Sequence, residues 1–307
     1  MNRIAMFSVL LIILFLLILC ITARIYEVNF GYRSDITEDE IKEILSHYPK
    51  LSREKEEILT KENIKLVGYW YNKQQNQPII IFSQGIGTRV IGYINEINYF
   101  ATNGYTVFAF DNTGCGESEG ENIRGLPQSV VDLDCVLSYI ENLEEYKDEK
   151  IFLYGHSWGG FAVCAVNNFN HRIAGVAERS GFNSTSRMIN SVVTKRQNKV
   201  VASIINPFVR VYEFLKFGKY TNSTAVSGIN SVKCPVMVMH SYDDEVVPYV
   251  VSISNYKDEI TNPNVVFKIY EDRGHNVTSK EGNYDYEALR EIKEFFDEIR
   301  EKGWFLF

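Results

Sequence analysis

The stretch IFLYGHSWGGFAVCAV occupies residues 151–166 of the chain. Its first four residues are apolar and β-prone, which predicts a short buried strand. The residues that follow Gly159 favour a helix. Between the two, the segment Gly155-His156-Ser157-Trp158-Gly159 has to turn sharply, with Ser157 at its tip. The stretch therefore predicts a strand, a tight turn bearing a serine, and a helix.

A serine flanked by glycines in that setting matches the G-x-S-x-G pattern of a nucleophile elbow. Side chains at Gly155 and Gly159 would collide with neighbouring backbone in so tight a turn, and glycine avoids this. The turn pushes the Ser157 hydroxyl out above the sheet, and the next helix points its unpaired N–H groups at the same spot. We therefore predict a nucleophilic serine; a glycine-rich structural turn is the alternative.

The bulk properties of the sequence restrict the class of protein. The 307 residues suffice for one α/β domain of roughly 250 residues with additional segments. A net charge of −7 argues against nucleic acid as the main partner. The five cysteines form no C-x-x-C pair and no metal-ligand spacing, so we predict free thiols and no metal site.

The N-terminus predicts a membrane segment. Residues 4–23 carry no charge, and about twenty residues at roughly 1.5 Å each span a hydrocarbon core of about 30 Å. A cleaved signal peptide is the alternative, but the stretch is long for one and ends without a small-x-small site. With only two residues before Arg3, we predict a single-pass helix whose N-terminus stays inside and whose main domain lies outside the cytoplasm.

Strand and helix signals alternate after a charged stretch. Thr37-Glu38-Asp39-Glu40 fits a capping box that opens a short amphipathic helix. The expected elements are strands at 64–71, 78–83, 106–111, 151–154, 173–178, 236–240 and 265–270, and helices at 93–102, 126–143, 159–168 and 284–302. Several strands are continuous apolar runs, which indicates a mostly parallel sheet flanked by helices. Residues 183–230 interrupt the alternation and predict a helical lid insertion.

A serine nucleophile needs a base to accept its proton and an acid to orient that base. Among the five histidines, His156 lies in the elbow and is expected to point into the fold, and His240 ends a strand, which favours a structural role. His275 follows a late strand. Loops after parallel strands gather at the carboxyl edge of the sheet, where Ser157 also emerges. We predict His275 as the general base.

The acid is expected in the loop after the strand at 236–240. Three carboxylates compete there, those of Asp243, Asp244 and Glu245. We favour Asp244, with Asp243 as the first alternative and Glu245 as the second. Any of the three could instead be a turn residue that caps backbone N–H groups.

With its order Ser157…Asp244…His275, the chain resembles the α/β-hydrolase superfamily. Residues 111–118 (DNTGCGES) resemble its D-x-x-G-x-G-x-S loop, which supports the floor of the active site. Residues 244–248 (DEVVP) resemble the D-x-V-V-P run after the strand that bears the acid. The resemblance covers residues 64–304 and is greatest to the serine-aminopeptidase-like and monoacylglycerol-lipase-like branch. It implies an α/β-hydrolase fold.

The resemblance also implies an oxyanion hole formed by the backbone N–H groups of Ile86 and Trp158. The chain departs from the family here, because residues 84–87 read Gln-Gly-Ile-Gly where relatives usually have His-Gly-x-Gly. The side-chain amide of Gln84 can still brace the loop by hydrogen bonds. The substitution therefore affects the position of the loop more than the chemistry.

The expected organisation is a transmembrane anchor at 1–24, a juxtamembrane spacer at 25–63 and a catalytic domain at 64–307. The lid segment carries seven basic residues against a single acid, Glu213, with apolar residues between them. Such a cationic amphipathic segment beside a membrane anchor suggests contact with an anionic lipid surface. The alternative, which we favour, is that its apolar face packs over the active site.

The sequence thus predicts a membrane-anchored serine hydrolase that acts on carboxylic esters, including lipid esters, with no metal or organic cofactor. An aminopeptidase of the same fold is the first alternative. Such an enzyme needs carboxylates to bind the ammonium group of its substrate, and the lid segment offers Glu213 alone. A non-catalytic binding protein and a transacylase are further alternatives. The expected partners are a small-molecule or lipid acyl substrate and the membrane, and the sequence leaves the oligomeric state open.

Overall fold

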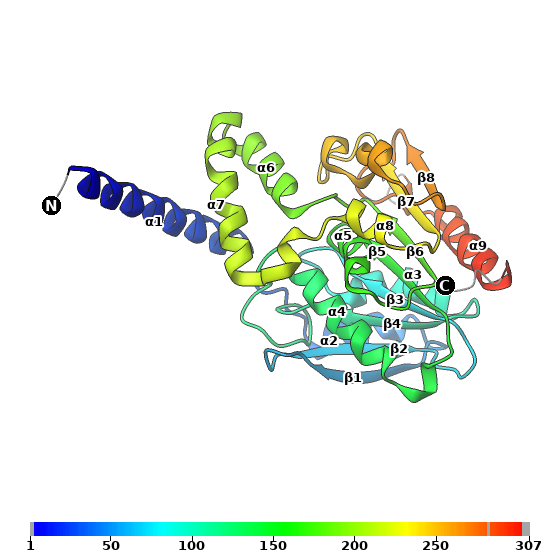
Figure 1. The fold of residues 1–307 in the computed structure, drawn as a ribbon. Coiled ribbons are helices and arrows are strands. Elements are labelled where there is room, and N and C mark those ends of the chain that lie inside the picture. Colours follow the sequence, from blue (N-terminus) through cyan, green and yellow to red (C-terminus); the bar gives the residue numbers. More distant parts are fainter. Residues whose placement is uncertain (1–2, 281–282, 303–307) are drawn as a thin grey trace.

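The computed structural model describes residues 3–280 and 283–302 (Figure 1). The strands are β1 (Arg53–Leu59), β2 (Lys65–Tyr71), β3 (Ile79–Ser83), β4 (Thr106–Asp111), β5 (Ile151–His156), β6 (Gly175–Arg179), β7 (Val236–Ser241), β8 (Val265–Tyr270), β9 (Ser279–Lys280) and β10 (Asn283–Tyr284). The α-helices are α1 (Arg3–Phe30), α2 (Glu38–Ser46), α3 (Ile94–Ala101), α4 (Gln128–Glu141), α5 (Trp158–Ala165), α6 (Thr185–Arg196), α7 (Lys199–Phe217), α8 (Ala225–Ser231) and α9 (Tyr286–Lys302). The 3₁₀ helices are η1 (Val90–Tyr93), η2 (Glu144–Tyr146), η3 (Val166–Phe169), η4 (Gly218–Asn222), η5 (Tyr249–Val251) and η6 (Ile253–Glu259).

Eight strands form one sheet in the order β1-β2-β4-β3-β5-β6-β7-β8. β1 and β4 pair with β2 in antiparallel fashion, and the remaining neighbours are parallel. Strands β3 to β7 are buried along their whole length, apart from the last residue of β5. This burial on both faces explains why they read as continuous apolar runs. The predicted mostly parallel sheet is confirmed.

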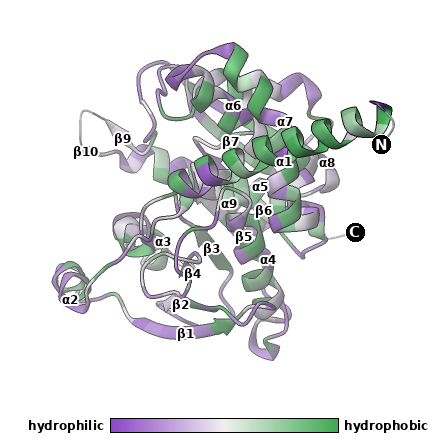
Figure 2. Ribbon diagram, turned by 90° about the vertical axis from the view of Figure 1, so that its left-hand side faces the viewer, coloured by the Kyte–Doolittle hydropathy of each residue, from purple (hydrophilic) through white to green (hydrophobic). Residues whose placement is uncertain are grey.

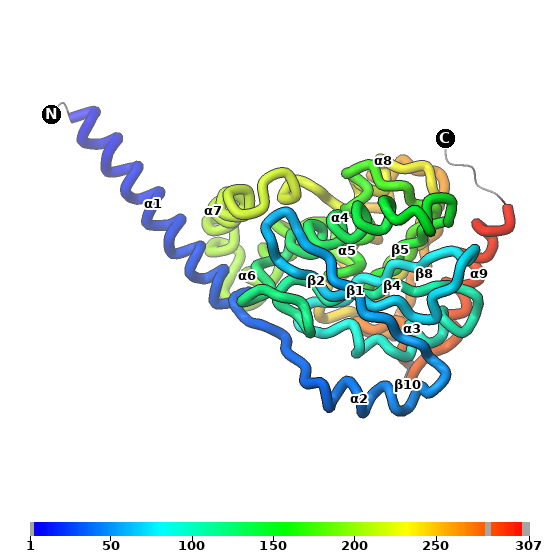
Figure 3. Tube along the Cα trace, turned by 90° about the horizontal axis from the view of Figure 1, so that it is seen from below, coloured from blue at the N-terminus to red at the C-terminus, as the bar shows by residue number. Residues whose placement is uncertain are grey.

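Helices cover both faces of the sheet (Figure 3). α4, α5 and α8 pack with the side chains of one face into one hydrophobic core, and α3 and α9 pack on the other face into a second. Elements expected from the sequence agree with the structure to within one to three residues at most ends. The five residues at the end of the predicted catalytic domain, 303–307, lie outside the described residues.

The spacer predicted at 25–63 contains a strand, β1, that the sequence patterns did not indicate. Its sequence, REKEEIL, is highly charged, and only one of its seven residues is buried. β1 is an edge strand that pairs with β2 alone, so its outer side faces water and tolerates charge. The sheet therefore begins at Arg53 rather than at residue 64. The predicted capping box at Thr37 and Glu40 is confirmed at the start of α2.

α1 projects from the body of the molecule, and its C-terminal part lies beside α7 (Figure 1). In the described part of the chain it is the one helix that is long and apolar enough to cross a membrane. Apolar side chains from Ile4 to Leu17 are exposed along it, and Figure 2 shows the helix as predominantly hydrophobic.

The expected lid insertion divides into two parts. α6 and α7 pack together as a pair that stands beside the end of α1 (Figure 1). α8 instead packs against α5 in the layer on the sheet, so closely that a Cβ at Gly228 would lie 2.0 Å from the carbonyl oxygen of Cys164. The part of the segment that lies away from the sheet therefore consists of α6 and α7, whereas α8 belongs to the helical layer on the sheet.

α7 is amphipathic, and much of its apolar surface is exposed. It buries Ala202, Val209, Glu213 and Phe217. It leaves exposed the side chains of Val200, Ile204, Val211, Phe214 and Leu215. The structure thus departs from the favoured expectation that the apolar face of this segment packs over the active site.

α7 is joined to α1 by polar contacts. Tyr26 donates a hydrogen bond to the Glu213 carboxylate at 2.8 Å, and Thr185 of α6 donates to its other oxygen at 2.8 Å. The Glu27 carboxylate accepts hydrogen bonds from Tyr212 and Lys216, both at 2.6 Å. α1, α6 and α7 therefore form one connected unit.

Burial raises the pKa of Glu213 to about 7, although the hydrogen bonds from Tyr26 and Thr185 and the charge of Arg210 oppose the shift. In the unfolded chain a glutamic acid ionises near pH 4.3. Between these values the folded protein holds one more proton than the unfolded chain, so Glu213 costs stability increasingly as pH rises to about 7. Glutamine does not ionise and avoids this cost. As pH rises from 5 to 8, the free energy of unfolding of Glu213→Gln should therefore increase by roughly 2–3 kcal/mol relative to that of wild type.

Chemical denaturation of the full chain in detergent at several pH values measures this difference. Glu43→Gln, at an exposed glutamate of α2, is the matched control and should change the free energy of unfolding by less than about 0.5 kcal/mol. A Glu213→Gln curve that runs parallel to wild type across this range would contradict the expectation.

Candidate active site

Ser157 lies between the end of β5 and the first residue of α5. Its backbone has φ 57° and ψ −111°, a conformation that non-glycine residues rarely adopt. Two hydrogen bonds hold this turn: the Ser157 N–H donates to Arg179 O at 2.8 Å, and the Phe161 N–H donates to Ser157 O at 2.9 Å. The strand, turn and helix predicted from residues 151–166 are therefore present.

The two glycines of the turn lie too close to backbone for any side chain. A Cβ at Gly155 would lie 2.3 Å from Gly159 O, and a Cβ at Gly159 would lie 2.0 Å from Ser83 O. Neither position can accept even alanine without movement of backbone. The steric reason inferred from the sequence holds at both residues.

His275 and Asp244 meet at the carboxyl edge of the sheet, on the loops after β8 and β7. His275 Nδ1 lies 2.8 Å from Asp244 Oδ2. The other carboxylate oxygen accepts the backbone N–H groups of Val246 and Val247, both at 2.9 Å. The buried carboxylate is thus fixed by its own loop and directed at the imidazole.

The two alternative acids lie elsewhere. Asp243 is exposed and accepts hydrogen bonds from the Ser241 hydroxyl at 2.5 Å and from the Gly274 N–H at 2.8 Å. Glu245 is exposed. Asp243 therefore caps the loop that carries His275, while Asp244 contacts the imidazole itself.

His156 is half-buried behind the elbow, and its ring is directed into the fold, as expected. One ring nitrogen lies 2.9 Å from the Tyr93 hydroxyl and the other lies 3.2 Å from His275 O. Burial, with the nearby Arg179 and His275, lowers the pKa of His156 well below its usual value. The ring is therefore neutral and braces the backbone of His275. Among the described residues, no hydrogen bond joins the Ser157 hydroxyl to His275.

The loop after β3 carries Ile86, the first of the two expected oxyanion donors. The Gln84 side-chain amide donates to Thr88 O at 3.1 Å, and the Thr88 hydroxyl donates to Gly85 O at 2.8 Å. The Gly85 N–H donates to the Tyr93 hydroxyl at 2.9 Å. Gln84 thus braces this loop through its amide, as the sequence suggested.

Trp158, the second expected donor, is the first residue of α5, where backbone N–H groups lack helical partners. A Cβ at Gly85 would lie 3.6 Å from the Cβ of Ser157, so the two loops are neighbours.

The D-x-x-G-x-G-x-S loop lies beneath this region. The Asp111 carboxylate accepts the N–H groups of Val90 at 2.9 Å and Glu117 at 3.2 Å. The Ser118 hydroxyl donates to Asp111 O at 2.6 Å and accepts the Val67 N–H at 2.7 Å. The loop therefore ties β2 and β4 to η1, which follows the oxyanion loop.

Known proteins are similar to this chain in sequence and in fold. The family model described as serine aminopeptidase, S33, matches residues 74–177. Lysophosphatidylserine lipase ABHD12 of Danio rerio is 26% identical over 196 residues, which are 59% of this chain and 47% of that protein. Monoglyceride lipase of Mus musculus is 33% identical over 93 residues, 30% of each chain. The esterase Pf2001 of Pyrococcus furiosus superposes with a TM-score of 0.66 at 19% identity, covering 88% of this chain and 98% of that one.

The chain belongs to the α/β-hydrolase superfamily. The matched family model and the lipase relatives also agree with the branch predicted from the motifs. The matched regions span less than half of each of these two curated relatives.

This α/β hydrolase has a buried ionic cluster that sequence reasoning did not find. The fully buried Arg179, at the end of β6, donates to Glu96 at 2.6 Å, to the Tyr154 hydroxyl at 2.9 Å and to the Asn276 side chain at 2.6 Å. Asn276 follows His275 directly, and Arg179 O accepts the Ser157 N–H. Arg179 thus connects the nucleophile turn, through its backbone carbonyl, to the histidine loop, through its guanidinium. No periodicity or motif pairs Glu96 with Arg179, because the two are far apart in sequence.

Replacing Glu96 with alanine should lower the free energy of unfolding by about 3–5 kcal/mol, because it leaves a buried guanidinium without its counter-charge. Denaturant unfolding in detergent measures the loss. Glu287→Ala, at an exposed ion pair with Arg290, is the matched control and should cost less than about 1 kcal/mol. The double variant Glu96→Met/Arg179→Met removes both charges and should recover most of the loss. Equal costs for Glu96→Ala and Glu287→Ala would refute this account.

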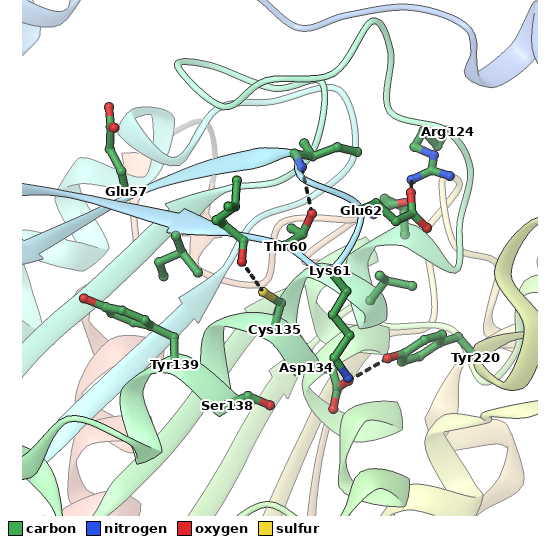
Figure 4. Close-up of a pocket in the computed structure, with 15 residues that line it drawn as sticks. Glu57, Thr60, Lys61, Glu62, Arg124, Asp134, Cys135, Ser138, Tyr139 and Tyr220 are labelled. Atoms are coloured by element: carbon green, nitrogen blue, oxygen red, sulfur yellow. Dashed lines mark hydrogen bonds and ion pairs between the residues drawn. The ribbon is translucent and has the colours of Figure 1, made fainter.

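A pocket of about 410 Å³ lies elsewhere, between the β1–β2 hairpin and α4 (Figure 4). Its lining includes Leu59, Cys135 and Tyr139, with an ion pair between Glu62 and Arg124. None of the candidate catalytic residues lines it. The pocket is therefore separate from the site on the carboxyl edge of the sheet.

Proposed function

We propose that this chain is a membrane-anchored serine hydrolase that cleaves carboxylic esters, lipid esters among them. The observation that carries the proposal is the 2.8 Å contact between His275 Nδ1 and the buried Asp244 carboxylate. That contact lies at the sheet edge where Ser157 sits in a strained turn. Esterase and lipase relatives support the same reaction class.

The proposed reaction has two steps. Ser157 Oγ attacks the acyl carbonyl while His275 takes its proton, and Asp244 stabilises the resulting imidazolium. The N–H groups of Ile86 and Trp158 hold the oxyanion. The C–O bond to the leaving alcohol breaks as His275 returns the proton to it. Water then attacks the acyl-serine with His275 as base, which releases the acid and restores Ser157.

Two features favour lipid-like esters over peptides. α7 exposes apolar side chains beside α1, and an apolar helix next to a proposed membrane anchor suits a substrate that resides in a membrane. Glu213, the one acid of the segment 183–230, is buried and accepts hydrogen bonds from Tyr26 and Thr185. It is therefore not free to bind the ammonium group that an aminopeptidase recognises.

The proposed organisation follows from these points. Residues 1–24 would anchor the chain, with the catalytic domain outside the cytoplasm. Basic residues of α6 and α7, such as Lys195, Arg196 and Lys199, would then face anionic headgroups.

The test is hydrolysis of p-nitrophenyl esters from acetate to palmitate by the full chain in mild detergent, with aminoacyl p-nitroanilides alongside. We expect ester turnover with a preference for medium or long acyl chains and little amide turnover. Amide hydrolysis that exceeds ester hydrolysis would favour the peptidase alternative. A folded protein that hydrolyses neither would overturn the proposal.

A further inference from the structure

Residues 31–35, in the segment between α1 and α2, pack against the loops of the candidate active site. The Ser34 N–H donates to Gly114 O at 3.0 Å, and the Gly116 N–H donates to Ser34 O at 2.7 Å. The Arg33 guanidinium donates to Gly116 O and Gly120 O, both at 2.8 Å. These contacts hold the segment firmly against the D-x-x-G-x-G-x-S loop.

The side chain of Ser34 reaches the oxyanion loop. Its hydroxyl donates to Gly87 O at 3.1 Å, and the residue is only 8% exposed. Gly87 follows Ile86 directly and has φ 71°, so the chain changes direction there. A hydrogen bond at this point restricts the backbone next to the proposed oxyanion donor.

The other side-chain braces of this loop come from nearby in the sequence. Gln84 and Thr88 belong to the loop itself, and Tyr93 follows five residues after Thr88. Within the described residues, Ser34 is the side chain from a distant segment that donates a hydrogen bond to this loop, at Gly87 O. Because the backbone of Ser34 is itself fixed to residues 114 and 116, its hydroxyl has a defined position.

The same stretch of chain also holds the lid helices. A few residues before Ser34, Tyr26 and Glu27 bind Glu213 and Lys216 of α7. The chain from Tyr26 to Ser34 therefore links α7 to the oxyanion loop, and it connects both to the proposed anchor.

From this geometry we infer that Ser34 is a positioning residue for the oxyanion hole, which it orients by holding Gly87 O. The inference rests on the proposed hydrolase function. The Ser34 hydroxyl touches no reacting atom and acts through the backbone that runs from the Gly87 carbonyl back to the Ile86 N–H. Its removal leaves the Ile86 N–H in place on average but less well directed at the oxyanion. Transition-state binding should weaken while ground-state binding does not.

The expected result for Ser34→Ala in the full chain is about a tenfold fall in kcat on p-nitrophenyl butyrate with KM little changed. This is less than the 10²–10³-fold typical of deleting an oxyanion donor. A trifluoromethyl ketone, which forms a tetrahedral oxyanion with a nucleophilic serine, should bind more weakly by the same factor. Ser46→Ala is the matched control, because that hydroxyl also donates to a backbone carbonyl, Glu43 O, but within α2.

A second pair of variants separates the effect of the Ser34 hydroxyl from the effect of side-chain packing. Ser34→Thr keeps the hydroxyl and Ser34→Val has the same shape without it, so this pair decides the matter if Ser34→Ala is unstable. A threonine variant with about tenfold higher kcat than the valine variant supports the inference. Equal kcat and equal ketone affinity in the two variants, or full kcat in a stable Ser34→Ala, would overturn it. Absence of ester hydrolysis by wild type is a different result and counts against the proposed function instead.

Discussion

Ser157→Ala should lower kcat for ester hydrolysis by on the order of 10⁴–10⁶-fold, with little change in stability. The hydroxyl supplies the nucleophile that forms the acyl-enzyme, and alanine lacks it. Residual turnover would come from the oxyanion hole and substrate binding alone. Steady-state hydrolysis of p-nitrophenyl butyrate measures the fall.

Ser180 provides a matched control for Ser157→Ala. It follows β6 as Ser157 follows β5, it is buried, and it has the same φ of 57°. Its hydroxyl has no hydrogen-bond partner within the described residues. Ser180→Ala should therefore retain kcat to within about threefold, as expected for a change outside the reacting groups. If Ser157→Ala kept more than a small fraction of the wild-type rate, the elbow would have no catalytic role.

Asp244→Asn should lower kcat by about 10³–10⁴-fold, whereas Asp243→Asn should lower it less than about fivefold. An asparagine at 244 keeps the shape but cannot stabilise the imidazolium of His275, and its amide favours the wrong tautomer. Asn at 243 can still accept the hydrogen bonds from Ser241 and Gly274 that hold the loop. The pair of variants thus separates the orienting acid from the loop cap.

Steady-state rates and melting temperatures of both asparagine variants measure these effects. The two carboxylates are adjacent in sequence, so effects of overall charge are equal in the two proteins. A larger loss in Asp243→Asn than in Asp244→Asn, at equal melting temperatures, would reverse the assignment.

The sheet was largely predictable because its central strands are buried on both faces. Runs such as 79–83 and 151–154 contain almost no polar residue, which is typical of a strand at the centre of a parallel sheet. β1 was not predictable by the same rule. Its charged sequence resembles a solvated spacer, and only its pairing with β2 at the edge of the sheet makes it a strand.

The candidate site was predictable where it depends on local patterns. The elbow has its own spacing, and the histidine and acid follow strands whose carboxyl ends share one edge. The sequence favoured Asp244 but left Asp243 as an alternative in the same loop, and the geometry separates them, since Asp244 contacts the imidazole and Asp243 accepts the Gly274 N–H. Arg179, Glu96 and Ser34 act across long sequence separations, and each looks like an ordinary polar residue in its own segment. Such contacts depend on the tertiary structure and leave no local signal.

For the predicted lid, the sequence indicated the helices but not where each of them packs. The polar and apolar composition of residues 183–230 indicated helices, and α6 and α7 are present. The sequence could not assign α8 to the sheet layer, because a small amphipathic helix can pack in either place. Nor could it show that the C-terminal end of α1 would pack against α7 through Tyr26 and Glu27.

The most direct test of a nucleophilic Ser157 is covalent labelling. The full chain in detergent is treated with a fluorophosphonate, whose phosphorus an activated serine attacks with loss of fluoride. Digestion and mass spectrometry then locate the modified residue. We predict stoichiometric modification at Ser157, with loss of esterase activity in proportion to labelling. Modification at another residue, or full inactivation with Ser157 unmodified, would contradict the account.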